Sequence, residues 1–213
     1  MENIKLIIFD LDGTLVDAYT AISNSFNYVM RRLGLKTQSA NTVRRLVGWG
    51  DINLLKPYLR QKDLKQAISL YRAHHKHSLL KYSHLYPHAK SVLRRFKSQG
   101  YKLAVASNRP SKFSHILLKH LEIGVFFDYV LCADQANHGK PHPEILNRIV
   151  KHFGLKKSQA LYVGDMVIDA QAGKRAKINT VIVTSGSSGK LDVKREKPFR
   201  IISAISGLPK LLK

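Results

Sequence analysis

Apolar and polar positions alternate along the chain in blocks that predict strands and helices in turn. The first apolar run, residues 4–9, stops at Asp10 and predicts a strand covered by helices on both faces. Further strands are expected at residues 102–106, 129–132, 160–163 and 180–183. Helical spacing separates them, at residues 88–98, 111–121, 143–153 and 168–176. Repeated βα units of this length predict an α/β fold with a doubly wound, Rossmann-like parallel sheet.

A second pattern interrupts this alternation after the first strand. Helices are expected at residues 18–33, 42–47, 52–59 and 64–80, and no strand pattern is found up to about residue 83. The sequence therefore predicts an α/β core domain made of residues 1–15 and 87–213, with an all-helical cap domain, residues 16–86, inserted into it. Near the end of the chain, residues 185–189 are expected to be a flexible surface loop and residues 203–212 a helix that covers the sheet.

The composition is strongly basic, with 36 Lys and Arg against 14 Asp and Glu and a net charge of +22. The charge is spread along the chain without a dense basic block or a motif that reads a nucleic-acid groove. A basic proteome or an adaptation to ionic strength therefore explains it as well as nucleic-acid binding does, and in either case a positive surface would attract anionic substrates. A single cysteine, Cys132, excludes an intrachain disulfide and indicates a reducing cytoplasm. No apolar run approaches membrane-spanning length, and the N-terminal run lacks the features of a signal peptide.

Polar side chains follow the predicted strands at the point where each strand ends. Because ligands bind at the carboxyl ends of parallel strands, we expect these groups to gather at one edge of the sheet. They are Asp10 and Asp12, Ser107 and Asn108, Lys140 on a loop stiffened by two prolines, and Asp165 with Asp169.

These groups together suit the transfer of a phosphoryl group. A phosphate ester repels a lone carboxylate, so a nucleophilic aspartate needs a cation and hydrogen-bond donors beside it. Lys140 supplies the cation, and Ser107 with backbone N–H groups at a helix start supplies donors. The carboxylates of Asp165 and Asp169, with Asp10 and the Asp12 backbone carbonyl, form an all-oxygen set that suits Mg²⁺.

Each motif alone has a simpler interpretation. Asp10 to Thr14 would also fit a polar turn with a helix cap or a fragment of a calcium loop, although the Glu that such a loop needs a dozen residues later is missing. Ser107 and Asp165 would also fit helix caps, and Lys140 a solvated surface charge. None of these interpretations explains why all four motifs follow strand ends.

In this order, Asp-Leu-Asp-Gly-Thr-Leu-Val-Asp, Ser-Asn-Arg-Pro, Gly-Lys-Pro-x-Pro-Glu and Gly-Asp-x-x-x-Asp are jointly specific. Over nearly its whole length the chain resembles the haloacid dehalogenase superfamily, in its phosphatase branch with a helical cap, and most closely the phosphoglycolate-phosphatase-like group. An aspartate at position 12 argues against the dehalogenase branch.

The resemblance implies a role for each motif residue. Asp10 would be the nucleophile that forms an aspartyl-phosphate, and Asp12 the general acid and then base. Ser107, Asn108 and Lys140 would bind the phosphoryl group. Mg²⁺ would be held by Asp10, the Asp12 carbonyl and Asp165, with Asp169 orienting Lys140 or metal-bound water.

Substrate choice is expected to depend on the cap segment 44–51. Arg45, or Arg44, would be a second anion clamp, and Trp49 beside Gly48 would be either a mobile lid contact or part of the cap core. The cluster His74, His75 and His77 lacks a convincing set of further ligands, so solvated histidines are expected there rather than a metal site.

The resemblance implies a Mg²⁺-dependent phosphatase of a small phosphomonoester such as phosphoglycolate. The alternative is a phosphomutase of a hexose phosphate, which uses the same aspartates but keeps water from the intermediate. A third alternative, based on the net charge, is a nucleic-acid-associated protein or a polynucleotide-end phosphatase.

Overall fold

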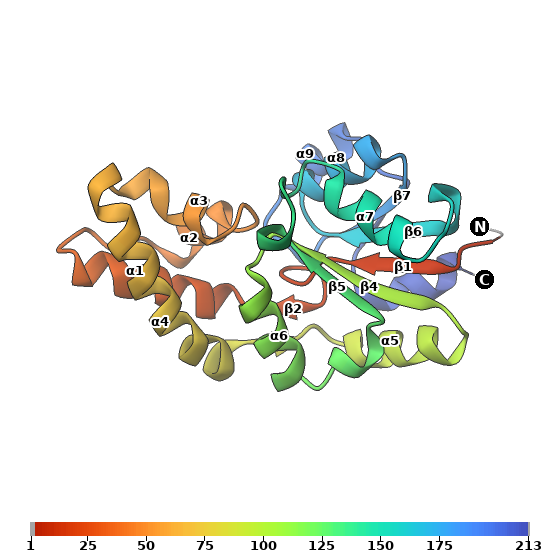
Figure 1. Cartoon of the computed structure of the whole chain (residues 1–213), viewed down its shortest axis with the longest axis horizontal. Coiled ribbons are helices and arrows are strands. Elements are labelled where there is room, and N and C mark those ends of the chain that lie inside the picture. Colours follow the sequence, from red (N-terminus) through yellow and green to blue (C-terminus); the bar gives the residue numbers. More distant parts are fainter. Residues whose placement is uncertain (1–2, 213) are drawn as a thin grey trace.

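The computed structural model describes residues 3–212, which form a parallel six-stranded sheet with helices on both faces and a separate group of helices at one end (Figure 1). The strand order is β5-β4-β1-β6-β7-β8, and every pair of neighbours is parallel. The strands are β1 (Leu6–Phe9), β4 (Lys102–Ser107), β5 (Tyr129–Cys132), β6 (Ala160–Gly164), β7 (Asn179–Val183) and β8 (Arg200–Ile202). This is the doubly wound α/β fold that the sequence predicts.

The two faces of β1 are buried in different layers. Ile7 and Phe9 pack into a core shared with α5 (Ala89–Ser98), α6 (Ser111–His120) and the 3₁₀ helix Ile205–Leu211. Leu6 and Ile8 pack on the opposite face, against α7 (Glu144–His152) and α8 (Val167–Ala176). All four side chains are fully buried, which explains why the first apolar run shows no alternation with polar residues.

The helices of the insert lie beyond the carboxyl ends of the strands, as Figure 1 shows. They are α1 (Tyr19–Arg32), α2 (Ala40–Leu46), α3 (Asp51–Leu55), the 3₁₀ helices Lys56–Tyr58 and Gln61–Asp63, and α4 (Leu64–Tyr82). Their buried side chains, Phe26, Val43 and Tyr71 among them, continue the core that lies under α5 and α6. A short antiparallel pair, β2 (Val16–Asp17) and β3 (His84–Leu85), joins the insert to the sheet domain.

Several short elements differ from the expectation. The pair β2 and β3, the strand β8 and the helix α9 (Lys190–Arg195) were not predicted, because two to six residues are too few to show a period. The expected helix at 52–59 changes to a 3₁₀ helix at Lys56, next to Pro57, and the expected terminal helix is a 3₁₀ helix that contains Pro209. Across residues 3–212 no helix has the length and apolar character needed to cross a bilayer.

Candidate active site

A cavity of about 50 Å³ lies between the carboxyl end of β1 and the helices of the insert. Both parts of the chain line it, so a molecule bound there would touch the sheet and the helical insert together. From the sheet side it is lined by Asp10, Asp12, Ser107, Asn108, Arg109, Pro110, Phe113 and Lys140, and from the helical side by Ile22, Val47, Gly48, Gly50, Asp51, Leu54, Tyr71 and His75.

Lys140 is buried beneath Asp10, the first residue after β1. Its Nζ lies 2.9 Å from Asp10 Oδ1 and 2.8 Å from Asp169 Oδ1. The Tyr162 hydroxyl lies 3.1 Å from the same Nζ and donates to Asp169 Oδ1 at 2.6 Å. Burial acts to lower the pKa of Lys140, but Asp10 and Asp169 outweigh it and raise that pKa above its ordinary value. The ammonium is therefore fixed in position and stays charged.

Three buried carboxylates cluster near this ammonium, which pairs with two of them, Asp10 and Asp169. Oxygens of Asp10, Asp165 and Asp169 lie within 4.8 Å of one another. Burial raises the pKa of Asp10 to about 7, against the opposing effect of Lys140, and burial with the neighbouring Asp169 raises the pKa of Asp165 well above its usual range. With Lys140 as the only cation among them, ionised carboxylates would leave two negative charges uncompensated. A divalent cation would balance these two negative charges, and carboxylate oxygens are ligands that such a cation prefers.

Asp169 differs from the other two carboxylates in that two protein donors occupy each of its oxygens, whereas each oxygen of Asp165 accepts a single bond, from Thr14 (3.0 Å) and from Tyr19 (3.5 Å). Oδ2 accepts from the backbone N–H groups of Asp165 (3.1 Å) and Met166 (2.9 Å), which closes the first turn of α8. Oδ1 accepts from Lys140 and Tyr162. Burial acts to raise the pKa of Asp169, but Lys140 and these hydrogen bonds hold it below its ordinary value. Asp169 is thus placed to orient Lys140 and the Asp165 turn, more than to face a metal directly.

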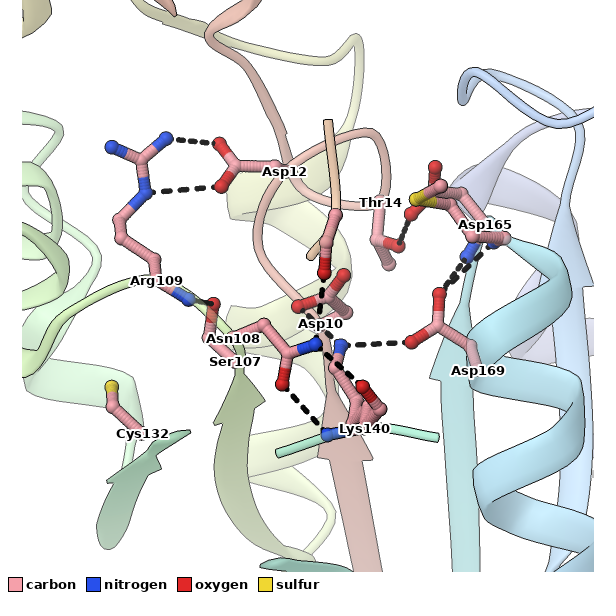
Figure 2. A network of polar contacts seen from close by, with 12 residues as sticks. Asp10, Asp12, Thr14, Ser107, Asn108, Arg109, Cys132, Lys140, Asp165 and Asp169 are labelled. Carbon is pink, nitrogen blue, oxygen red and sulfur yellow. Dashed lines mark hydrogen bonds and ion pairs between the residues drawn. The ribbon is translucent and has the colours of Figure 1, made fainter. Parts of the chain in front are cut away.

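Asp165 is held from the opposite side by the first motif. The Thr14 hydroxyl donates to Asp165 Oδ1 at 3.0 Å (Figure 2). Gly13, which stands between Asp12 and Thr14, has φ +82°. A Cβ on this residue would collide with the Asp165 carboxylate and the Tyr19 hydroxyl. Only glycine therefore allows the chain after β1 to turn this close to Asp165.

Asp12 points away from Asp10 and pairs with Arg109. Arg109 donates from Nε to Asp12 Oδ2 at 3.0 Å and from Nη2 to Oδ1 at 2.5 Å, a two-point ion pair that Figure 2 shows in full. The Arg109 side chain is 5% exposed and that of Asp12 is 15% exposed. A bidentate pair of this kind fixes both the position and the orientation of the carboxylate.

His75, on α4, completes this group from the insert. Its Nε2 lies 2.9 Å from Arg109 Nη1, and its Nδ1 lies 3.0 Å from the Ser25 hydroxyl. Burial and then the charge of Arg109 lower the pKa of His75 well below its usual value. The ring is therefore neutral, with Nε2 as acceptor for Arg109 and Nδ1 as donor to Ser25. The expectation of solvated histidines is wrong for His75, which is 2% exposed and stacks on Tyr71.

Ser107 and Asn108 lie at the end of β4. Ser107 is buried and lines the cavity, where its hydroxyl accepts from the Arg109 backbone N–H at 3.2 Å. The Asn108 amide donates to the carbonyls of Gly48 and Lys140, both at 2.8 Å, and accepts from the Lys140 N–H at 2.7 Å. The Asn108 side chain thus ties the lysine loop to the insert, which leaves its backbone N–H as the group that can face an anion.

The expected substrate-selecting residues of the insert are separated in space. Gly48 lines the cavity, whereas Trp49 is 45% exposed and not part of the core of the insert. Arg45 is exposed and does not line the cavity. Arg44 instead stacks on Tyr19 and donates to the carbonyl of Ser185 at 2.9 Å.

The loop after β7, which is expected to be a surface loop, also contacts the site. Residues 185–188 are half-buried. The Ser185 hydroxyl donates to the Gly13 carbonyl at 2.7 Å, and its own carbonyl accepts from the Tyr86 hydroxyl at 3.2 Å. The loop is therefore partly exposed and also packs its backbone closely against the first motif and Asp165.

Sequence patterns do not indicate a role in the site for three of its residues, Arg109, Thr14 and Tyr162. Arg109 stands directly after Ser107 and Asn108, and that adjacency is a usable signal. Thr14 is expected only as a helix cap, and Tyr162 only as part of a strand. His75 stands out in the sequence as part of a histidine cluster, but its burial and its contact with Arg109 are not expected from that pattern. Cys132, by contrast, is a buried free thiol in β5, as expected of a core residue.

Comparison with known proteins gives consistent matches. A family model described as haloacid dehalogenase-like hydrolase matches residues 7–183. A phosphoglycolate phosphatase of Nitrosococcus oceani is 32% identical over 216 residues, covering 98% of this chain and 96% of that protein. A phosphoglycolate phosphatase of Aquifex aeolicus is 32% identical over 182 residues, covering 85% of each chain.

Solved structures show the same likeness in three dimensions. The crystal structure of a predicted phosphoglycolate phosphatase from Haemophilus somnus superposes with a TM-score of 0.96 at 29% identity, over the full length of both chains. A haloacid dehalogenase-like family hydrolase from Streptococcus pneumoniae superposes with a TM-score of 0.91 at 25% identity, again over both full chains. The sheet and the helical insert are therefore matched together.

Proposed function

Because the chain belongs to the haloacid dehalogenase-like hydrolase family, we propose that it is a Mg²⁺-dependent phosphatase, which hydrolyses a small phosphomonoester through an aspartyl-phosphate on Asp10. The observation that carries this proposal is the contact of Asp10 with the buried Lys140 at 2.9 Å, inside a cavity that the helical insert covers. A carboxylate held against a fixed ammonium can approach a phosphate that would otherwise repel it.

In the first step, a carboxylate oxygen of Asp10 attacks phosphorus and the bond to the ester oxygen breaks. In this step Asp12 carries a proton on an oxygen that has given up its hydrogen bond from Arg109, and it transfers that proton to the leaving oxygen, so the alcohol departs neutral. In the second step, Asp12 takes a proton from water, the water oxygen attacks phosphorus, and the bond to Asp10 breaks. Free phosphate leaves and both aspartates return to their starting states.

Lys140 and Ser107 are proposed to hold the phosphoryl group during both steps. Lys140 offsets the charge of Asp10 and of the incoming phosphate at the same time, and Asp169 with Tyr162 keeps it in place. Ser107 presents a buried hydroxyl to the cavity. The backbone N–H of Asn108 would add a further donor.

Asp10, the Asp12 carbonyl and Asp165 are the proposed ligands of Mg²⁺, with Asp169 in support. The three buried carboxylates and their raised pKa values at Asp10 and Asp165 fit a divalent cation, as set out above. When bound, Mg²⁺ would offset the charge of the phosphate oxygens and of Asp10.

The relatives named phosphoglycolate phosphatase make phosphoglycolate the first candidate substrate. The small cavity volume favours a short phosphoester over a hexose phosphate or a polynucleotide end. In this proposal residues 16–86 act as the cap domain over the core domain, and the reduced, buried Cys132 suits an enzyme of the cytoplasm.

A substrate profile tests the proposal. Phosphate release from phosphoglycolate, ethyl phosphate, hexose phosphates, nucleotides and pyrophosphate is measured with Mg²⁺ and with excess EDTA. We expect Mg²⁺-dependent release, fastest from phosphoglycolate. Absence of release from every monoester, or an isomerised sugar phosphate without free phosphate, would overturn the proposal.

A further inference from the structure

Arg109 and Lys140 are the two cationic side chains that line the cavity among the described residues, since His75 is neutral. Lys140 is committed to Asp10 and Asp169, at the end of the cavity where the phosphoryl group is proposed to bind. Arg109 lies on the side of the cavity next to the insert, where it contacts His75 of α4. A bound molecule that carries two anionic groups would thus meet a separate cation at each end.

The guanidinium of Arg109 has donors beyond those that Asp12 uses. Asp12 accepts from Nε and Nη2, and His75 accepts from Nη1. Each Nη carries two N–H groups, so one on Nη1 and one on Nη2 have no acceptor among the hydrogen bonds of residues 3–212. Figure 2 shows Asp12 along one edge of the guanidinium and the third nitrogen turned away from it. The cation can therefore take a second carboxylate without releasing Asp12.

Among the described residues that line the rest of the cavity, none carries another cationic side chain. Ile22, Leu54 and Phe113 line it with apolar atoms, and Asp51 is an anion whose own partner is Arg72 at 2.7 Å. A carboxylate placed here without Arg109 would be buried without an opposite charge, at a large cost.

We propose that Arg109 binds the carboxylate of the substrate and so selects short phosphoesters that carry one. This inference rests on the phosphatase activity proposed above and names the residue that sets its substrate class. His75 is the positioning residue for Arg109, because its neutral Nε2 accepts from Nη1 and its other nitrogen is anchored to Ser25. Arg44 and Arg45, by contrast, do not line the cavity.

The experiment compares phosphoglycolate with its carboxamide, which has nearly the same shape without the charge. The kcat/KM for each is measured for the wild type, Arg109→Gln, Arg109→Lys and, as a charge-matched control, Arg94→Gln on the exposed face of α5. The readout is kcat/KM for phosphoglycolate divided by kcat/KM for the carboxamide. A general loss of activity through Asp12 affects both values equally and cancels in this ratio. We expect Arg109→Gln to lower this ratio by about 100-fold, as for loss of one partner of a buried charge pair. Arg109→Lys should lower it less, and Arg94→Gln should leave it unchanged.

Binding without turnover provides a second readout. In an Asp10→Asn background, isothermal titration with phosphoglycolate is repeated with and without Arg109→Gln, and the dissociation constant should rise by about 100-fold. Circular dichroism checks that each variant is folded. If Arg109→Gln does not fold, Arg109→Lys decides the question, because a lysine cannot reproduce the forked donor geometry.

The outcomes separate this inference from the proposed function. If the wild type hydrolyses both esters equally well, or if the ratio is the same in folded Arg109 variants, Arg109 does not select the carboxylate while the phosphatase proposal stands. If the wild type releases phosphate from neither ester nor from ethyl phosphate, the phosphatase proposal itself fails.

Discussion

The Tyr162 hydroxyl donates a 2.6 Å hydrogen bond to the Asp169 oxygen that also accepts from Lys140. Tyr162 is fully buried in β6, and burial with the nearby carboxylate of Asp169 raises its pKa well above the usual value, so the hydroxyl keeps its proton and acts as a donor. Through this bond, a strand residue below the site sets the position of the lysine that contacts Asp10.

Tyr162→Phe removes this donor from a buried network. We expect the free energy of unfolding to fall by about 1–3 kcal/mol, because Asp169 loses a hydrogen bond that water cannot replace. The midpoint of urea unfolding measures the change. Tyr129→Phe is the control, since Tyr129 lies on a strand of the same sheet and its hydroxyl has no hydrogen bond among those of residues 3–212. Equal midpoint shifts in the two variants would contradict the importance of the Tyr162 bond.

Asp10→Asn keeps the shape of the side chain and removes its negative charge. If Asp10 is the nucleophile, kcat should fall by about 10⁴-fold or more, because the amide cannot form the phospho-enzyme. Phosphate release in single and multiple turnover measures the loss, and circular dichroism serves as the folding control. Residual activity within about tenfold of the wild type would place the nucleophile at another residue.

Mg²⁺ should stabilise the folded protein as well as support turnover. The carboxylates of Asp10 and Asp165 repel each other in the metal-free protein, and a cation held by both relieves that repulsion. At a free concentration of 100 times the dissociation constant, binding adds about 2.7 kcal/mol to the free energy of unfolding. The thermal midpoint measured with Mg²⁺ and with EDTA tests this gain, and Asp165→Asn should reduce it. A midpoint that Mg²⁺ leaves unchanged in the wild type would contradict the assigned ligands.

His75 makes the stability of the fold depend on pH in a defined direction. Its pKa in the folded protein lies well below 6.5, so the unfolded chain binds more protons than the folded one once the pH falls below about 6.5. The contribution of neutral His75 to the free energy of unfolding is fully present above that pH. It is lost as the pH decreases, by up to about 1.4 kcal/mol per pH unit. His75→Gln retains a neutral acceptor and removes the titration.

Urea unfolding of the wild type and His75→Gln between pH 7 and pH 5, in EDTA and at constant ionic strength, measures this dependence. The difference between the two proteins is the readout, because the carboxylates of the site titrate in both. We expect the wild type to lose more stability than His75→Gln as the pH falls. Parallel curves would show that His75 binds its proton equally in the folded and unfolded states, so that its pKa in the folded protein is not lowered, contrary to the expectation.

The strands and helices that were predicted correctly are those whose burial is continuous along the element. Residues 129–132 were placed without error, and the predicted limits of the strand at 160–163 differ by one residue. The pair β2 and β3 has two residues on each side, and no periodicity exists over that length. Such a pair is specified by the contact between chain segments far apart in the sequence, which local patterns do not encode.

The site was predictable as far as each group stands at the end of a strand. Asp10, Lys140, Asp165 and Asp169 meet in the structure because parallel strands end at one edge. The Ser-Asn-Arg-Pro motif contains Arg109 but does not indicate its role, because its partner Asp12 lies 97 positions away in sequence. The role of His75 could not be read from its neighbours either, because burial between α4 and the sheet domain, and not the local sequence, determines its neutral state.

Asn108 has a consequence for how a substrate enters. Its amide holds the Gly48 carbonyl of the insert and both backbone groups of Lys140. If the helices moved away from the sheet to admit a substrate, the bond to Gly48 would have to break, and the residue that supports the lysine loop would lose one of its three bonds. Such an opening would loosen the support of Lys140, so the ammonium is held best in the closed arrangement, in which the insert also restricts the access of water to Asp10.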